Sequence, residues 1–135
     1  MPDLKDPAYW DTSFLRAAGR LLMLAAFEER PGHGYDIARR LSNVCGDWCN
    51  PSAAMIYPAI HELEAGGLIE CEVDSSTAHK RRVCRLTEDG REALRVGMAA
   101  WARFLPVMAG VVAASGQEAA DGGCCGVETD PCDAP

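Results

Sequence analysis

The 135-residue sequence lacks the features of membrane and exported proteins. No apolar run approaches the roughly 18 residues that cross a bilayer. The most hydrophobic stretch, residues 105–114, is short and contains Pro106. The first twelve residues are polar and acidic, and they do not have the apolar core of a signal peptide. We therefore expect a cytoplasmic protein that does not associate with membranes.

A catalytic constellation is also missing. The three histidines, His33, His61 and His79, are expected in a turn, a helix and a hairpin, without a plausible nucleophile beside them. No glycine-rich phosphate-binding loop follows a predicted strand. The sequence therefore argues against an enzyme and requires no cofactor.

Basic residues are in the minority, because 13 Lys and Arg stand against 20 Asp and Glu, for a formal net charge of −7. Residues 118–135 account for much of this excess, since they hold five acidic residues and no Lys or Arg. Residues 79–82, in contrast, read His-Lys-Arg-Arg. DNA affinity depends on a local basic face and not on the total charge, so a DNA-binding protein is not excluded.

Hydrophobic periodicity predicts a mainly α-helical chain with one small β-hairpin. Helices are expected at residues 14–29, 33–43 and 51–65, strands at 68–73 and 82–86, and a long helix after Thr87. In the third helix, Ile56, Ile60 and Leu63 recur on one face and should be buried. This order of elements is typical of a winged helix-turn-helix with an additional C-terminal helix.

The last helix carries apolar residues at alternating spacings of four and three: Leu94, Met98, Trp101, Leu105, Met108 and Val112. An isolated helix cannot bury such a seam, so we expect a homodimer. The chain then divides into an N-terminal arm (1–13), a winged-helix domain (14–86), a dimerisation helix (87–115) and a flexible cysteine-rich tail (116–135).

Two motifs carry a family resemblance. One is Arg30-Pro-Gly-His-Gly-Tyr-Asp-Ile-Ala-Arg-Arg-Leu41, and the other is Tyr57-Pro-Ala-Ile-His-Glu-Leu-Glu-Ala-Gly-Gly-Leu-Ile69. Together they resemble the PadR family of transcriptional regulators over roughly residues 15–100. The resemblance implies a dimeric repressor whose third helix enters the major groove and whose wing touches the DNA backbone or minor groove. It also implies release of DNA when an effector binds.

The candidate DNA-binding residues share a predicted exposed position on the third helix or in the wing: Ser52, Ala53, Tyr57, His61, His79, Lys80, Arg81 and Arg82. Hydroxyl groups can donate to phosphates, and alanines permit close approach to the groove. The basic run suits phosphate or minor-groove contacts. The alternatives are packing alone for Tyr57 and an ordinary solvated surface for the basic run.

Seven cysteines are an unusual number, and in the cytoplasm we expect them to be reduced thiols. Cys124, Cys125 and Cys132 lie in a tail that has no core to fill, and thiolates select soft ions. The pattern is similar to thiolate triads in arsenic-responsive winged-helix repressors of a different family. We expect trivalent arsenic as the effector ion, with cadmium, zinc and mercury as alternatives.

The other four cysteines have more than one interpretation. Cys45 and Cys49 could join the tail site, form a second metal site, or simply pack. Cys71 and Cys84 fall on the two predicted strands, where packing is favoured, although they could meet across the hairpin as a redox switch.

Two other functions stay open. One is a repressor that answers an aromatic small molecule, with Trp10, Trp48 and Trp101 lining a pocket at the dimer seam. The other is a thiol-redox sensor or metal-buffering protein whose winged helix contacts other proteins.

Overall fold

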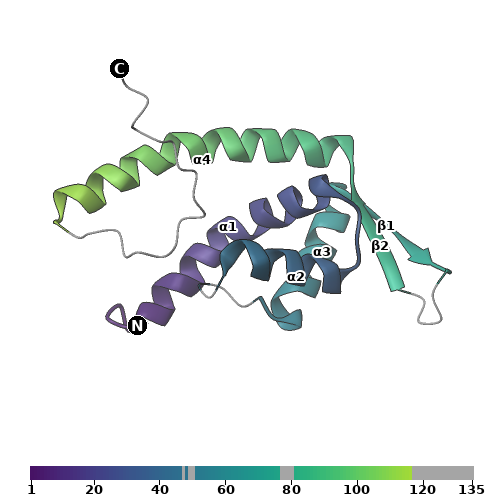
Figure 1. Ribbon diagram of the computed structural model, residues 1–135, viewed down its shortest axis with the longest axis horizontal. Coiled ribbons are helices and arrows are strands. Elements are labelled where there is room, and N and C mark those ends of the chain that lie inside the picture. The colour runs from purple at the N-terminus through teal and green to yellow at the C-terminus, as the bar shows by residue number, and fades with distance from the viewer. Residues whose placement is uncertain (47, 49–50, 77–80, 117–135) are drawn as a thin grey trace, which may run out of the picture. The chain divides into compact units, whose positions relative to one another are not determined.

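The computed structural model confirms a mainly helical fold with a two-stranded antiparallel hairpin (Figure 1). It describes residues 1–46, 48, 51–76 and 81–116. In chain order the elements are α1 (Pro7–Glu29), α2 (Gly34–Cys45), α3 (Ala53–Ala65), β1 (Ile69–Asp74), β2 (Arg81–Leu86) and α4 (Glu88–Ala114). The chain divides into two compact units, residues 1–99 and 100–135, and the boundary between them falls in the sequence of α4.

The core of the first unit lies where the helices meet the hairpin. Its most deeply buried side chains come from four different elements: Phe27, Ile37, Ile56 and Ile69. Burying each of these stabilises the fold by about 2 kcal/mol. Ile60 and Leu63 are buried beside Ile56, which confirms the predicted inward face of α3.

The helix starts follow from local capping. α1 begins at Pro7 and not at Phe14, so part of the predicted arm is helical. Asp6 explains this start, because its Oδ1 accepts a hydrogen bond of 3.0 Å from the Ala8 amide and proline suits the first helical position. Thr87 caps α4 as predicted, since its Oγ1 accepts from the Gly90 amide at 3.0 Å.

The hairpin agrees with the predicted strands to within one residue, and its register pairs Cys71 with Cys84. The amide and carbonyl of Cys84 bond to Gly32 at 2.9 and 3.1 Å, so they point away from β1. Cys71 and Cys84 are therefore a non-hydrogen-bonded pair, in which opposite side chains come closest. The structure joins them in a disulfide. The expectation of reduced thiols is wrong for this pair, because the register places the two sulfurs in contact.

Among the described helices, α4 is long and apolar enough to cross a membrane by length and composition alone. An 18-residue window in it has a mean hydropathy of 1.6, and none of that window is buried within the chain. The stretch of residues 105–114, expected to be too short for a bilayer, is thus part of a longer apolar helix, although Arg103 interrupts its apolar residues. Along the predicted seam, Leu94 is buried, whereas Met98 and Leu105 are about half exposed.

Candidate nucleic-acid interface

The outward face of α3 carries the predicted DNA-binding residues. Ser52 precedes the helix, and its backbone oxygen accepts hydrogen bonds of 3.0 Å from the amides of Met55 and Ile56. Ser52, Ala53, Tyr57 and His61 are all exposed, and the exposed fraction of Tyr57 is 51%. The buried stripe of α3 thus leaves these four residues on its accessible side.

A cleft of about 390 Å³ lies between the start of α2, α3 and β2. Tyr57 and His61 line it from α3, and Arg81 and Arg82 line it from β2. Four of the predicted DNA-binding residues, which come from two separate segments of the sequence, therefore share one concave surface.

Gly34 allows α2 to approach α3 at this cleft. A Cβ atom at Gly34 would lie 2.9 Å from Tyr57 Cε1 and 3.3 Å from Ile60 Cδ1. The first distance is shorter than carbon atoms tolerate, so any larger residue would push the Tyr57 ring. The glycine of the His-Gly-Tyr motif is thus needed for the position of a side chain that lines the cleft.

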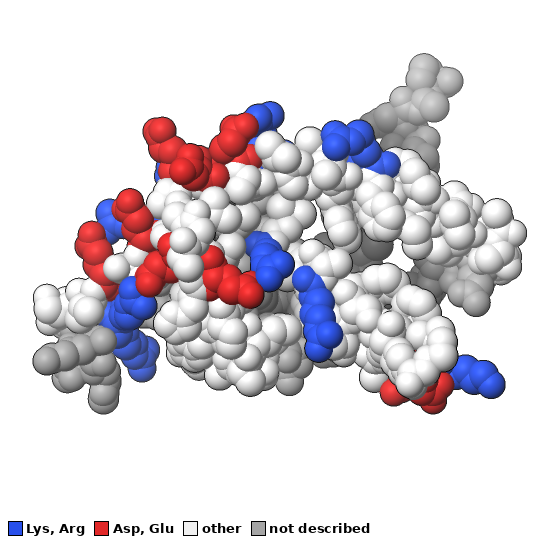
Figure 2. All heavy atoms as spheres, turned by 180° about the vertical axis from the view of Figure 1, so that it is seen from behind, with Lys and Arg blue, Asp and Glu red and all other residues white. Residues whose placement is uncertain are grey.

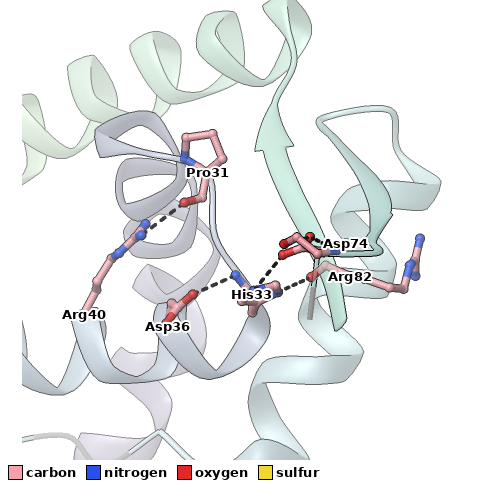
Figure 3. Close-up of polar contacts among 7 residues, drawn as sticks. Pro31, His33, Asp36, Arg40, Asp74 and Arg82 are labelled. Carbon is pink, nitrogen blue, oxygen red and sulfur yellow. Dashed lines mark hydrogen bonds and ion pairs between the residues drawn. The ribbon is translucent and has the colours of Figure 1, made fainter. Parts of the chain in front are cut away.

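His33 ties the start of α2 to both strands of the hairpin (Figure 3). Its Nδ1 lies 3.1 Å from the backbone oxygen of Arg82, so this nitrogen carries a proton and donates. Its Nε2 lies 3.8 Å from Asp74 Oδ2, and its backbone amide donates to Asp36 at 3.1 Å. Sequence reasoning placed His33 only in a turn, although the His-Gly-Tyr motif was a signal for it.

Asp74, at the end of β1, is the hairpin residue whose carboxylate lies near Nε2 of His33 in this contact. Hydrogen bonds from the hydroxyl and amide of Ser76 lower the pKa of the Asp74 carboxyl, and the nearby His33 lowers it further. Asp74 is therefore charged at neutral pH, and its contact with Nε2 is attractive whenever that nitrogen also carries a proton.

Arg40 fixes the turn that presents His33 (Figure 3). Its guanidinium donates to the carbonyl oxygens of Ala26, Arg30 and Pro31 at 3.0, 2.7 and 3.2 Å. These carbonyls belong to the end of α1 and the segment that follows it. One arginine thus satisfies acceptors that the helix end leaves unpaired and holds α1 against α2.

The basic groups of the hairpin are partly neutralised within the chain. Arg82 forms an ion pair with Glu64 of α3, and Arg85 lies 3.5 Å from Glu72 of β1. Figure 2 shows Lys and Arg side chains interspersed with Asp and Glu at the hairpin end of the molecule. A DNA phosphate that contacts Arg82 has to displace the carboxylate of Glu64 or share the guanidinium with it.

Most of the predicted metal ligands belong to the part of the chain that the structure does not describe. Cys49, Cys124, Cys125 and Cys132 lie outside the described residues, as do His79 and Lys80 of the wing. Cys45 is described and is disulfide-bonded, so it can act as a thiolate ligand only after reduction. Over the described ranges, no group of three or more His, Cys, Asp or Glu side chains is arranged to hold a metal ion.

The model of the transcriptional regulator PadR-like family matches residues 22–96 of this chain. The chain is 37% identical to the transcriptional regulator Rv3488 of Mycobacterium tuberculosis over 81 residues, which cover 60% of this chain and 73% of that protein.

Solved structures are similar in fold. A transcriptional regulator from Clostridium thermocellum matches with a TM-score of 0.69 and 19% identity, over 74% of this chain and 98% of that one. A PadR family regulator from Eggerthella lenta matches with a TM-score of 0.68 and 24% identity, over 78% of this chain and 90% of that one. The chain therefore belongs to the PadR-like family of transcriptional regulators, whose members are DNA-binding transcription factors and not enzymes.

Proposed function

We propose that the protein is a cytoplasmic, dimeric repressor that holds operator DNA against the α3–β2 cleft. The observation that carries this proposal is the convergence of Tyr57, His61, Arg81 and Arg82 on one concave surface. Hydroxyl, imidazole and guanidinium groups are the donors that proteins use on phosphates and base edges. A helix of 13 residues is about 20 Å long, and the major groove admits such a helix.

The roles follow from position. Tyr57 and Ser52 lie toward the start of α3 and donate to phosphates, while Ala53 allows the helix end to come close to the groove. His61, one turn beyond Tyr57, reaches a base edge. Arg81 and Arg82 on the hairpin contact the backbone or the adjacent minor groove, together with His79 and Lys80 of the same basic run.

Dimerisation accounts for the exposed apolar seam of α4. Members of this family typically dimerise. Met98 and Leu105 are about half exposed in the single chain, and a second α4 would cover them. A two-fold dimer would present two copies of α3 to successive major grooves, about 34 Å apart.

DNA binding is tested with a duplex selected by the wild-type protein from a random-sequence pool, with affinity measured by fluorescence anisotropy. Arg81→Ala and Tyr57→Phe each remove about 1 kcal/mol per protomer, so each should weaken binding by the dimer by about thirtyfold. Arg103→Ala, an exposed arginine on α4, serves as the matched control and should bind like the wild type. Selection of no duplex, or full affinity in both interface variants, would contradict the proposal.

The effector in this proposal is a thiophilic ion, for which trivalent arsenic is the best candidate. Its support is the sequence: Cys124, Cys125 and Cys132 supply three thiol groups within nine residues. Soft thiolates suit arsenic, cadmium, mercury or zinc, and the short connecting loop costs little to close. Capture of the ion, with Cys45 and Cys49 as further donors, orders the tail and lowers DNA affinity.

The ion is tested on fully reduced protein titrated separately with arsenite, cadmium and zinc, with free thiols counted afterwards. Arsenite should saturate at no more than one ion per protomer, protect about three thiols and release the duplex. Cys124→Ser/Cys125→Ser should bind DNA normally but not respond. Release that survives this double replacement would contradict the tail site and favour an aromatic effector.

A further inference from the structure

One member of the Cys71–Cys84 pair, Cys84, lines the proposed DNA cleft. Cys84 lines the cleft beside Arg82 and is only 3% exposed, whereas Cys71 on the edge strand β1 is half-buried. Cys84 is also the residue at which β2 pairs with Gly32 on its other side. The disulfide therefore joins β1 to the strand that is anchored in the core.

The backbone keeps these two cysteines adjacent whether or not they are bonded. The hairpin register pairs them directly, and the hydrogen bonds between Gly32 and Cys84 hold β2 independently of the sulfur atoms. Reduction therefore leaves two thiols facing each other, ready to form the bond again.

We propose that Cys71 and Cys84 are a reversible redox couple that sets the DNA affinity of the hairpin, an inference that rests on the proposed DNA-binding function. It is separate from the ion site in the tail, since neither cysteine belongs to the predicted metal ligands. The oxidised chain binds DNA more tightly because the disulfide closes the segment between residues 71 and 84, which therefore has less freedom to lose on binding.

The chemistry balances with a peroxide as oxidant. The more exposed thiolate of Cys71 attacks one peroxide oxygen and becomes a sulfenic acid, and the other oxygen leaves as water after protonation. The Cys84 thiolate then attacks the Cys71 sulfur, the S–S bond forms, and a second water leaves. Two electrons pass from the two thiols to one hydrogen peroxide. A dithiol reverses the reaction by attacking Cys71 and releasing Cys84.

The test compares full-length protein treated with hydrogen peroxide or with dithiothreitol, using the duplex selected from the random pool. Peptide mapping establishes the state of the pair. Reduction should weaken binding of the wild type by about fivefold. It should also speed hydrogen exchange at the amides of residues 72–74 and 81–83, because the covalent closure of the hairpin is lost.

Two variants separate this pair from the other cysteines. Cys71→Ser keeps Cys84 in the core and should bind like the reduced wild type under both treatments. Cys124→Ser/Cys125→Ser should keep the full redox response. A redox response as large in Cys71→Ser as in the wild type, or equal affinity of the mapped oxidised and reduced wild type, would overturn this inference alone. Failure to bind any duplex in either state would overturn the proposed function and this inference with it.

Discussion

Gly34→Ala should separate DNA binding from stability. The new Cβ would lie 2.9 Å from Cε1 of Tyr57, an atom at the far end of a side chain that can swing away. The ring should therefore move by several tenths of an ångström into the cleft, while the backbone of α2 and α3 stays in place. The variant thus displaces an interface side chain without removing any group.

The size of the effect follows from the interaction that Tyr57 loses. A hydrogen bond from its hydroxyl to phosphate contributes about 1 kcal/mol, so two protomers lose about 2 kcal/mol, or roughly thirtyfold in Kd. The free energy of unfolding should change by less than about 1 kcal/mol, because the better helix propensity of alanine offsets the tight contact.

Anisotropy titrations and urea unfolding measure the two quantities on the same protein. Gly19→Ala is the matched control on α1, where an added Cβ meets nothing within 4 Å, and its DNA affinity should be unchanged. Wild-type affinity in Gly34→Ala would refute the role given to Tyr57. A loss of stability above about 3 kcal/mol would show that Gly34 belongs to the core packing instead.

Three further predictions concern stability and charge. Gly90→Ala should lower the free energy of unfolding, measured with urea, by about 3 kcal/mol, because its Cβ would lie 2.1 Å from the backbone oxygen of Leu68. Gly110→Ala is the control and should not be destabilising, because an added Cβ there meets nothing within 4 Å. Reduction should lower the free energy of unfolding of the wild type by about 3 kcal/mol more than that of Cys71→Ser, because only the wild type has the Cys71–Cys84 crosslink to lose. Arg81→Ala should reduce the slope of log Kobs against log salt concentration by about 2, about 1 for each protomer of the dimer, and an unchanged slope would exclude a phosphate contact there.

The sequence was sufficient for the elements and for the inward face of α3. Ile56, Ile60 and Leu63 recur at helical spacing, and burying them leaves Tyr57 and His61 outside, as the structure confirms. The hairpin was equally predictable, because polar turn residues separate its two short strands. Local periodicity thus carries the information for local structure.

Contacts between distant segments were beyond this reasoning. His33 and Arg82 are 49 residues apart, and nothing local indicates that the imidazole meets that carbonyl. The Cys71–Cys84 bond depends on strand register, in which a shift of one residue turns every side chain to the other face. The His33 contact was therefore not predicted, and the meeting of Cys71 and Cys84 was predicted only as the alternative to simple packing.

The start of α1 was missed for a different reason. Asp6-Pro7 is a recognisable helix start, but the prolines and charges around it were interpreted as a mobile arm. The local signal for a helix start was therefore present, but the composition of residues 1–13 favoured an arm outside the helices.

Photo-crosslinking is the sharpest test of whether α3 faces DNA. The photoreactive amino acid p-benzoylphenylalanine would replace Tyr57, with the same replacement at Val96, an exposed residue of α4, as the control. After irradiation with the selected duplex, we expect covalent protein–DNA adducts from position 57 and none from position 96. Adducts from position 96 alone, or none from position 57 on a duplex that still binds, would contradict this expectation.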